Sequence, residues 1–243
     1  MERLAMAVRD ALSDDVRVKL APQRSALIPT IHLRRVETSS EISPYLASAT
    51  KRSFDIAVAL VLLMILSPLM LLVAGCIKWT SSGCVVFRQK RHGRQQVPFE
   101  IFKFRSMYAE CGADPSVPQA TSQDPRVTPL GRVLRKSSID ELPQLFNVLR
   151  GEMSLIGPRP HALVHDEKYL AELPAYGMRF AALPGLTGLA QVNGARGETP
   201  TLAHMQRRLQ FDLEYIRTAS LLLDLKILIW TAVLVVTNRT NAY

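Results

Sequence analysis

Residues 54–79 form the one long apolar run of the chain. A helix of about 20 apolar residues is long enough to cross a bilayer, so this run predicts a membrane segment. Ser67 and Pro68 lie in its middle, where proline removes a backbone donor and bends a helix. The run is therefore predicted either to cross the membrane as a kinked helix or to break at this pair.

Basic residues flank the apolar run on both sides: Lys51 and Arg52 precede its core, and Lys78 lies at its end. Positively charged flanks favour the cytoplasmic side. A helix that enters, breaks at Ser67 and Pro68 and returns to the same face satisfies both observations. An ordinary kinked span remains equally compatible, because membrane helices tolerate proline. In either case the Ser67 hydroxyl is a candidate partner for a carbonyl freed at the break.

Alternating polar and apolar residues predict a β-hairpin from residues 85–89 and 98–105, joined through residues 92–94. The period of two places Lys103 and Arg105 on one side of the second strand. Two cations on one face could bind phosphates. A charged edge strand that resists pairing with other chains is the more ordinary explanation.

A helical stripe of Leu142, Leu145, Phe146 and Leu149 predicts a helix that starts at about residues 138–140 and stops at Gly151. Proline fits the first turn of a helix, so the proline at 143 is compatible with that start.

Asp140 and Glu141 would then occupy the helix N-terminus, where free N–H groups favour an ionised carboxylate. Such a carboxylate can hold a divalent cation or attack a phosphorus atom. Helix capping is the ordinary explanation for an isolated pair of this kind.

The remaining segments predict less. Residues 1–50 are polar and interrupted by prolines, which predicts a weakly ordered extension, and residues 109–129 read as a long loop. Residues 201–217 predict a helix. Residues 221–236 are apolar but short of a span, which predicts a helix lying in the membrane interface or beside the membrane segment, with a buried core helix as the alternative.

The net charge of +9 in 243 residues indicates an anionic partner, which could be nucleic acid, a phosphorylated substrate or an acidic membrane surface. The chain lacks an RNA-binding aromatic cluster and zinc-finger spacing, so we expect no nucleic acid. Cys76, Cys84 and Cys111 form no C-x-x-C pair and read as reduced thiols in a cytosol-facing protein.

Arg159 lies between two prolines, which lowers the entropy cost of presenting its guanidinium to a phosphate or carboxylate. His161 and His165 are four residues apart, but they lack a third metal ligand, so ordinary polar contacts are favoured. Residues 183–198 read as a glycine-punctuated loop containing Arg196. Their spacing matches neither a Rossmann site nor a P-loop.

Together these segments resemble the bacterial sugar transferase family, the monotopic phosphoglycosyl transferases, and within it the undecaprenyl-phosphate glucose or galactose phosphotransferases. The resemblance covers roughly residues 51–243. It is carried by K-R-x-x-D at 51–55, the Ser67–Pro68 pair, K-F-R-S-M at 103–107, D-P-R-V-T at 124–128, R-K-S-S-I-D-E-L-P-Q-L-F-N-V-L at 135–149, G-P-R-P-H-A at 157–162, P-G-L-T-G-L-A-Q-V-N-G at 184–194, R-G-E-T at 196–199 and L-D-L-K-I at 223–227.

The resemblance implies an α/β, mostly helical fold: an extension over residues 1–50, a re-entrant membrane helix over 51–80, and a cytosolic catalytic domain over 81–243 with a small hairpin and interfacial amphipathic helices. It implies transfer of a sugar-1-phosphate from a UDP-sugar to undecaprenyl phosphate with Mg²⁺, as the first membrane step of exopolysaccharide or glycan assembly. The catalytic domain would lie on the cytoplasmic face of the bacterial inner membrane. A homo-oligomer is left open.

Residue roles follow from the matching motifs. Asp140 matches the nucleophile, which forms a phosphosugar–enzyme intermediate, and Glu141 matches its catalytic partner; both are expected at the metal. Phosphate- and nucleotide-binding positions are expected at Arg135, Arg159, Lys103, Arg105 and Arg196. Ala195 replaces a bulkier residue common before R-G-E-T, which leaves the choice of sugar open. The alternative is a non-catalytic basic scaffold of a glycan assembly complex at the membrane surface.

Overall fold

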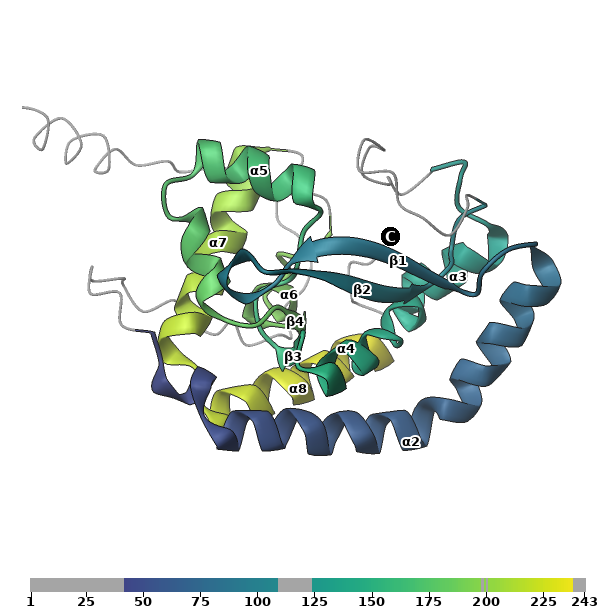
Figure 1. Ribbon diagram of the computed structural model, residues 1–243, viewed down its shortest axis with the longest axis horizontal. Helices are drawn as coiled ribbons and strands as arrows, with labels where there is room; N and C mark the ends of the chain where they lie inside the picture. The colour runs from purple at the N-terminus through teal and green to yellow at the C-terminus, as the bar shows by residue number, and fades with distance from the viewer. Residues whose placement is uncertain (1–41, 109–123, 198, 200, 238–243) are drawn as a thin grey trace, which may run out of the picture. The chain divides into compact units, whose positions relative to one another are not determined.

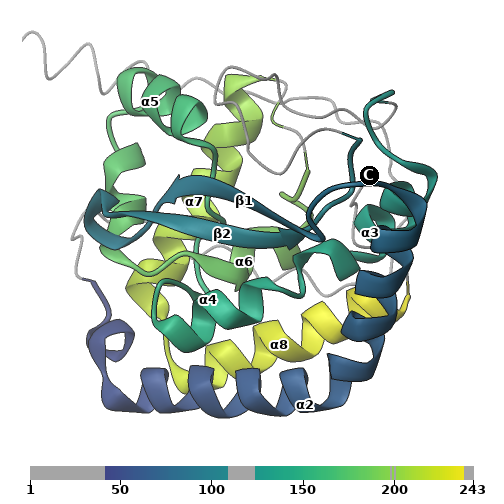
Figure 2. The same cartoon turned by 45° about the vertical axis from the view of Figure 1, so that its right-hand side comes forward.

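The computed structural model describes residues 42–108, 124–197, 199 and 201–237, which are mostly helical with two small sheets (Figure 1). This confirms the mostly helical part of the expected fold. Both views place α4 and α8 between the hairpin and the long helix α2 (Figure 2). The helices are η1 (Pro44–Ala47), α2 (Ala49–Thr80), η2 (Arg94–Gln96), α3 (Pro129–Ser137), η3 (Ile139–Glu141), α4 (Gln144–Arg150), α5 (Leu163–Glu172), η4 (Tyr176–Ala181), α6 (Leu189–Val192), α7 (Leu202–Thr218) and α8 (Leu221–Val236), and the strands are β1 (Val86–His92), β2 (Pro98–Phe104), β3 (Ser154–Ile156) and β4 (Gly185–Thr187).

The apolar run forms α2, whose 32 residues are long and apolar enough to cross a membrane by length and composition. The helix continues through Pro68 rather than breaking there, and its axis changes direction along its length (Figure 1). Proline has no N–H, so the carbonyl of Met64, four residues earlier, loses its helical partner. The Ser67 hydroxyl donates to that carbonyl at 3.1 Å, as the sequence suggested. Met64 is 73% exposed, whereas its neighbours Leu63 and Leu69 are partly buried against a core cluster.

A buried polar cluster fixes the N-terminal end of α2. Lys51 Nζ donates to Asp224 Oδ2 at 2.6 Å, to Asp55 Oδ1 at 3.3 Å and to the Ile156 carbonyl at 3.3 Å. The Tyr215 hydroxyl donates to Asp224 Oδ1 at 2.8 Å. Because a buried charge must be paired to be tolerated, these contacts hold α2 in one position against β3, α7 and α8.

The C-terminal end of α2 is fixed to the same folded unit. Arg105 donates to the carbonyl oxygens of Ser82 at 2.6 Å and Ser81 at 2.8 Å, just past the last turn. Ile77 packs in a core cluster with Phe104 of β2 and Leu134 of α3. Both ends of the apolar helix are therefore attached to one unit.

The hairpin prediction is confirmed: β1 and β2 pair in antiparallel fashion, with Val86 opposite Phe104 and His92 opposite Pro98. Asn147 joins α4 to β2. Its side chain accepts from the Phe102 N–H at 3.0 Å and donates to the Glu100 carbonyl at 2.7 Å.

These contacts of Asn147 show that the apolar stripe predicted for α4 was wrong at Phe146. Satisfying the strand's free backbone groups turns Asn147 inward and leaves Phe146 47% exposed. The buried face of the helix therefore includes polar residues that an apolar pattern does not reveal.

The glycine-punctuated segment at 183–198 is not all loop. β4 lies parallel to β3, with Ser154 opposite Gly185 and Ile156 opposite Thr187. A Cβ atom at Gly185 would lie 2.1 Å from the backbone nitrogen of Gly157. Glycine is required here because the backbones approach so closely, which explains a glycine within a strand.

The two C-terminal helices lie close to their predicted bounds, at α7 and α8. Helix α8 buries Asp224, Ile227 and Leu234 and exposes Leu222 and Ile229, each at 63%. It is therefore neither a core helix nor long enough to span a bilayer.

The described unit begins before the expected boundary at residue 51. Ser43 donates from its backbone N–H to the Ile216 carbonyl at 3.0 Å and from its hydroxyl to the Ala219 carbonyl at 2.7 Å. Residues 42–50 are thus part of the folded unit. The rest of the expected extension and most of the expected 109–129 loop lie outside the described residues.

Gly131 offers a test of the packing of α3. A Cβ atom there would lie 2.0 Å from the carbonyl oxygen of Ser106, a backbone atom that cannot rotate away. We expect Gly131→Ala to lower the free energy of unfolding by about 3 kcal/mol, the upper range for overpacking. Thermal unfolding of purified protein measures the effect. Gly75→Ala is the matched control, because a Cβ there meets nothing within 4 Å; equal losses in both variants would contradict this packing.

Candidate functional site

The two adjacent carboxylates lie on a short 3-10 turn, not at the N-terminus of an α-helix. Ser138 caps the turn in the left-handed region (φ 60°, ψ 15°), and α4 begins only at Gln144. The predicted start was too early because Pro143 has no N–H to continue a ladder of hydrogen bonds across the pair. The macrodipole of a long helix therefore does not stabilise Asp140 and Glu141; their neighbours set their charge.

Glu141 is surrounded by cations from three distant segments. It accepts from Lys103 Nζ at 2.8 Å, from Arg159 Nη1 at 3.1 Å and from Arg196 Nη2 at 3.2 Å. Burial alone would raise the pKa of Glu141, but Arg159, Lys103 and Arg196 outweigh it and hold the pKa well below its usual range. Glu141 is thus a permanently ionised anchor for the three cations.

Asp140 has the opposite environment. It is 7% exposed, and its carboxylate accepts no hydrogen bond from any described residue. Burial, and after it the charge of Glu141, raises the pKa of Asp140 to about 6 despite Lys103 and Arg135 nearby. Two neighbouring carboxylates whose environments push their pKa values apart are typical of a catalytic pair. With a pKa of about 6, Asp140 is largely ionised near neutral pH.

Four of the five predicted cations lie around this pair. Lys103 comes from β2, Arg159 from the segment between two prolines, and Arg196 from the loop after α6, where it also donates to Ser138 Oγ at 2.9 Å. Arg135, in the last turn of α3, donates to Ser106 Oγ at 2.9 Å, and its charge acts on Asp140.

Arg105 is not part of the group. Its guanidinium is held by the carbonyls of Ser81 and Ser82, and it stabilises the junction between α2 and the hairpin. The strand β2 ends at Phe104, so the alternation that put Arg105 beside Lys103 no longer applies one residue further on. Ser67 and Pro68 lie within α2, where the Ser67 hydroxyl bonds to the Met64 carbonyl, and among the described residues neither contacts the pair.

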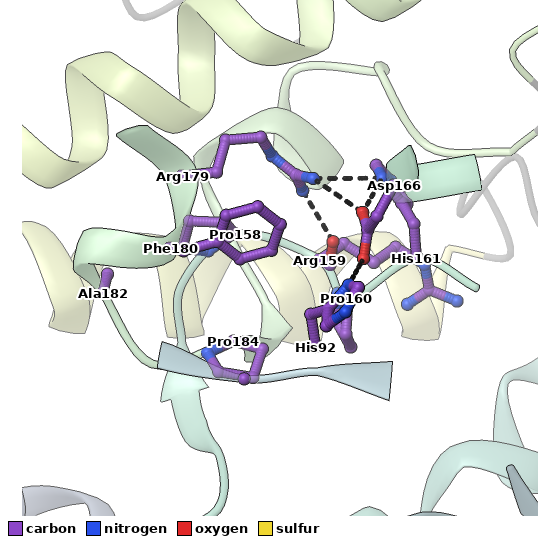
Figure 3. A pocket seen from close by; sticks show the side chains of 11 residues that line it. His92, Pro158, Arg159, Pro160, His161, Asp166, Arg179, Phe180, Ala182 and Pro184 are labelled. Carbon is purple, nitrogen blue, oxygen red and sulfur yellow. Dashed lines mark hydrogen bonds and ion pairs between the residues drawn. The ribbon is translucent and has the colours of Figure 1, made fainter. Parts of the chain in front are cut away.

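A small pocket adjoins Arg159 (Figure 3). Its walls include the two prolines beside Arg159 and the side chains of His92, Phe180 and Pro184. Of the residues lining it, Arg159 also contacts Glu141. Arg159 thus links the lining of this pocket to the carboxylate pair.

Several residues near Arg159 gave no signal in the sequence. Burial lowers the pKa of Arg91 to about 10, helped by the charge of Arg159, and its Nε has no partner among the described residues. Arg179 and Arg208 contact the segments bearing Arg159 and Arg196. They lie in unrelated stretches, so no spacing rule could have linked them to the site.

His161 makes several polar contacts. It lies before α5, so it does not share a helix face with His165. Nδ1 of His161 is 2.7 Å from the Tyr176 hydroxyl, and Nε2 is 3.0 Å from Arg208 Nη1. The described residues contain no group of three His, Cys, Asp or Glu side chains that could hold a metal.

The carboxylate pair fits Mg²⁺ only in combination with a phosphate ligand. Mg²⁺ is commonly bound by one or two carboxylates together with substrate phosphates and water. Asp140 has free oxygens for such an ion, whereas Glu141 would have to give up contacts with its three cations. Mg²⁺ at Asp140 and Glu141 stays a prediction.

Comparison with known proteins extends over most of the chain. The profile described as "Bacterial sugar transferase" matches residues 46–238. Several bacterial proteins that are similar to this chain are named UDP-glucose:undecaprenyl-phosphate glucose-1-phosphate transferase. The Caulobacter vibrioides protein is 46% identical over 93% of this chain and 84% of its own length. The Klebsiella pneumoniae protein is 50% identical over 74% of this chain and 39% of its own length. The Xanthomonas campestris protein is 46% identical over 88% of this chain and 43% of its own length. The chain thus spans less than half the length of two of these relatives.

Proposed function

Because the chain belongs to the bacterial sugar transferase family, we propose that it is a phosphoglycosyl transferase that moves a sugar-1-phosphate from a UDP-sugar to undecaprenyl phosphate. The names of its relatives make UDP-glucose the first donor to test. The observation that carries the proposal is the contrast within one buried pair: Glu141 binds three cations, and Asp140 binds none.

The charges of the substrates explain why such a pair is useful. A sugar nucleotide and a lipid phosphate are both anionic, so direct attack of one on the other is opposed by repulsion. A carboxylate nucleophile divides the transfer into two displacements, and fixed cations stabilise charge as it develops on the phosphate oxygens. Lys103, Arg159 and Arg196, held by Glu141, and Arg135 near Asp140 would supply those cations.

In the first step, an oxygen of Asp140 attacks the sugar-proximal phosphorus of the UDP-sugar. The bond from that phosphorus to the bridging oxygen breaks, and uridine monophosphate leaves with the electron pair. In the second step, an oxygen of the lipid phosphate attacks the same phosphorus, and the bond to Asp140 breaks. The carboxylate is regenerated, and the product is a lipid diphosphate sugar.

Mg²⁺, when bound, would neutralise the diphosphate of the donor and make uridine monophosphate a better leaving group. Asp140 and Glu141 are the residues that would help to hold it beside the donor phosphates. The arginines near the pair do not depend on the ion for their position, because protein groups already hold them.

The attachment of both ends of α2 supports a re-entrant helix. Lys51 binds β3 and α8 at one end, and Arg105 binds the carbonyls just past the other. A straight span would separate these ends by the thickness of the bilayer and could not keep both sets of contacts. The helix would dip into the inner membrane from the cytoplasmic face and keep the carboxylate pair near the lipid phosphates. The exposed apolar side chains of α8 would lie at the same interface.

Cysteine labelling tests this topology. In protein whose native cysteines are replaced by serine, we expect Ile42→Cys and Arg94→Cys, both exposed before and after α2, to react with an impermeant reagent from the same side of the membrane. Met64→Cys should resist the reagent from both sides because lipid covers it. Labelling of residues 42 and 94 from opposite sides would reject re-entry.

Release of uridine monophosphate tests the activity. Purified protein incubated with undecaprenyl phosphate, Mg²⁺ and a panel of UDP-sugars should release it with at least one hexose donor. Release should require the lipid phosphate at catalytic turnover. A protein that binds membranes but releases none from any donor would instead be a scaffold.

A further inference from the structure

We propose that His161, Arg179 and Arg208 form a positioning unit that sets Arg159 and Arg196 in place around Glu141. The inference rests on the proposed function and names residues that determine how well the reacting phosphates are gripped. None of the three touches Glu141. Arg179 and Arg208 each bind the backbone of a segment whose own arginine contacts Glu141, and His161 links these two segments.

Arg179 holds the segment of Arg159. Its Nη2 donates to the Arg159 carbonyl at 2.7 Å (Figure 3). Arg179 is 4% exposed, and its Nε donates to Asp212 Oδ2 at 2.8 Å, which ties it to α7. Since prolines on both sides already restrict the backbone at Arg159, fixing one carbonyl fixes the direction in which this side chain leaves the chain.

Arg208 holds the segment of Arg196 from both sides. Its Nε donates to the Ala195 carbonyl at 2.9 Å, and its Nη2 donates to the Gly197 carbonyl at 2.8 Å. The carbonyls just before and just after Arg196 are therefore bound by one buried, planar group, which fixes the loop between them.

His161 connects Arg179 with Arg208. Nε2 of His161 lies 3.0 Å from Arg208 Nη1, and arginine can only donate, so Nε2 must be the acceptor. The proton of the neutral ring is then on Nδ1, which donates to the Tyr176 hydroxyl at 2.7 Å. Arg179 Nη1 lies 3.0 Å from the same nitrogen, which cannot accept from it once protonated, so Arg179 donates to the hydroxyl instead. That hydroxyl also accepts from Arg179 Nη1 at 2.8 Å and donates to Asp166 Oδ1 at 2.7 Å.

This arrangement works only with a neutral imidazole. Burial, and the charges of Arg179 and Arg208, hold the pKa of His161 well below its usual range. A second proton would point an N–H at the guanidinium of Arg208. His161 can thus be packed between two arginines and accept from one of them without opposing their charge.

Replacing His161 by glutamine or by asparagine tests the contacts of its two ring nitrogens separately. Glutamine places its carbonyl near the position of Nε2 and can still accept from Arg208, whereas asparagine reaches only the position of Nδ1. We expect His161→Asn to lower kcat/KM for uridine monophosphate release from UDP-glucose by 10- to 100-fold, as misplaced catalytic groups commonly do. His161→Gln should stay within about threefold of wild type.

A double-mutant cycle with Arg196→Ala shows whether His161 acts through Arg196. If it does, His161→Asn should cost less than about twofold once Arg196 is gone. An unchanged loss in that background, or equal losses for the Asn and Gln variants, would overturn the proposal. Arg208→Lys, which cannot span both carbonyls, should behave like His161→Asn.

Trypsin cleavage after Arg196 gives a readout that does not depend on activity. Loosening the loop in His161→Asn or Arg208→Lys should speed this cut about tenfold, and His161→Gln should not. His204→Asn is the matched control, because His204 is exposed and contacts Thr201 near the start of α7. Unchanged cleavage would reject the positioning unit. A wild-type protein that releases no uridine monophosphate would reject the proposed function, and the cleavage assay would still judge this inference.

Discussion

Asp140→Asn should abolish release of uridine monophosphate, with a fall in kcat of at least about 10⁴-fold, because an amide cannot form the acyl phosphate. The change is isosteric and removes no hydrogen bond, since the Asp140 carboxylate accepts none from the described residues. A coupled assay of nucleotide release measures the effect. Glu172→Gln, which neutralises an exposed carboxylate of α5, is the control and should leave kcat unchanged.

The same substitution should stabilise the protein. Burial raises the pKa of Asp140 to about 6, so the folded state holds its proton more tightly than the unfolded chain does. The wild type therefore loses stability as pH rises from about 4 to 6, and Asp140→Asn does not. At pH 7 we expect the variant to be more stable by about 1–3 kcal/mol, with no gain below pH 4. A variant that is inactive and less stable at pH 7 would contradict this assignment.

Glu141→Gln should reduce both activity and stability. Without the negative charge, Lys103, Arg159 and Arg196 lose their common partner and repel one another. Removing one member of a buried ionic group costs about 3–5 kcal/mol, which thermal unfolding would report. We expect kcat/KM to fall by at least about 100-fold, because the cations no longer surround the reacting phosphate.

The control for this variant is Glu100→Gln. Glu100 lies on β2 and forms an exposed ion pair with Arg88 at 4.0 Å. Exposed pairs of this kind contribute about 0–1 kcal/mol, so the control should change little. If Glu141→Gln keeps wild-type activity while the protein stays folded, Glu141 is not the anchor of the cations.

The sequence predicted what depends on local pattern. The hairpin and α7 follow from periods of 2 and 3.6, and the Ser67 hydroxyl was matched to the carbonyl that Pro68 frees because that geometry is internal to one helix. Lys103 was found by counting along a strand. The same counting failed one residue past the strand end, at Arg105.

What the sequence could not give depends on contacts between distant segments. The stripe of α4 was misread because Asn147 pairs with the backbone of β2, about 45 residues earlier in the chain. Asp140 and Glu141 lie on a 3-10 turn because Pro143 interrupts the helix that the pattern predicted there. Arg179 and Arg208 lie in stretches with no motif, and their roles are set by carbonyls that only the folded chain brings near them.

The most direct test of the account is to look for the covalent intermediate. Wild-type protein mixed with an active UDP-sugar and Mg²⁺, but no lipid phosphate, should release about one uridine monophosphate per molecule and then stop. After acid quenching, mass spectrometry should find a hexose phosphate on the peptide containing Asp140, and adding undecaprenyl phosphate before the quench should remove it. Full turnover with lipid phosphate but neither a burst nor a modified peptide without it would contradict a two-step transfer through Asp140.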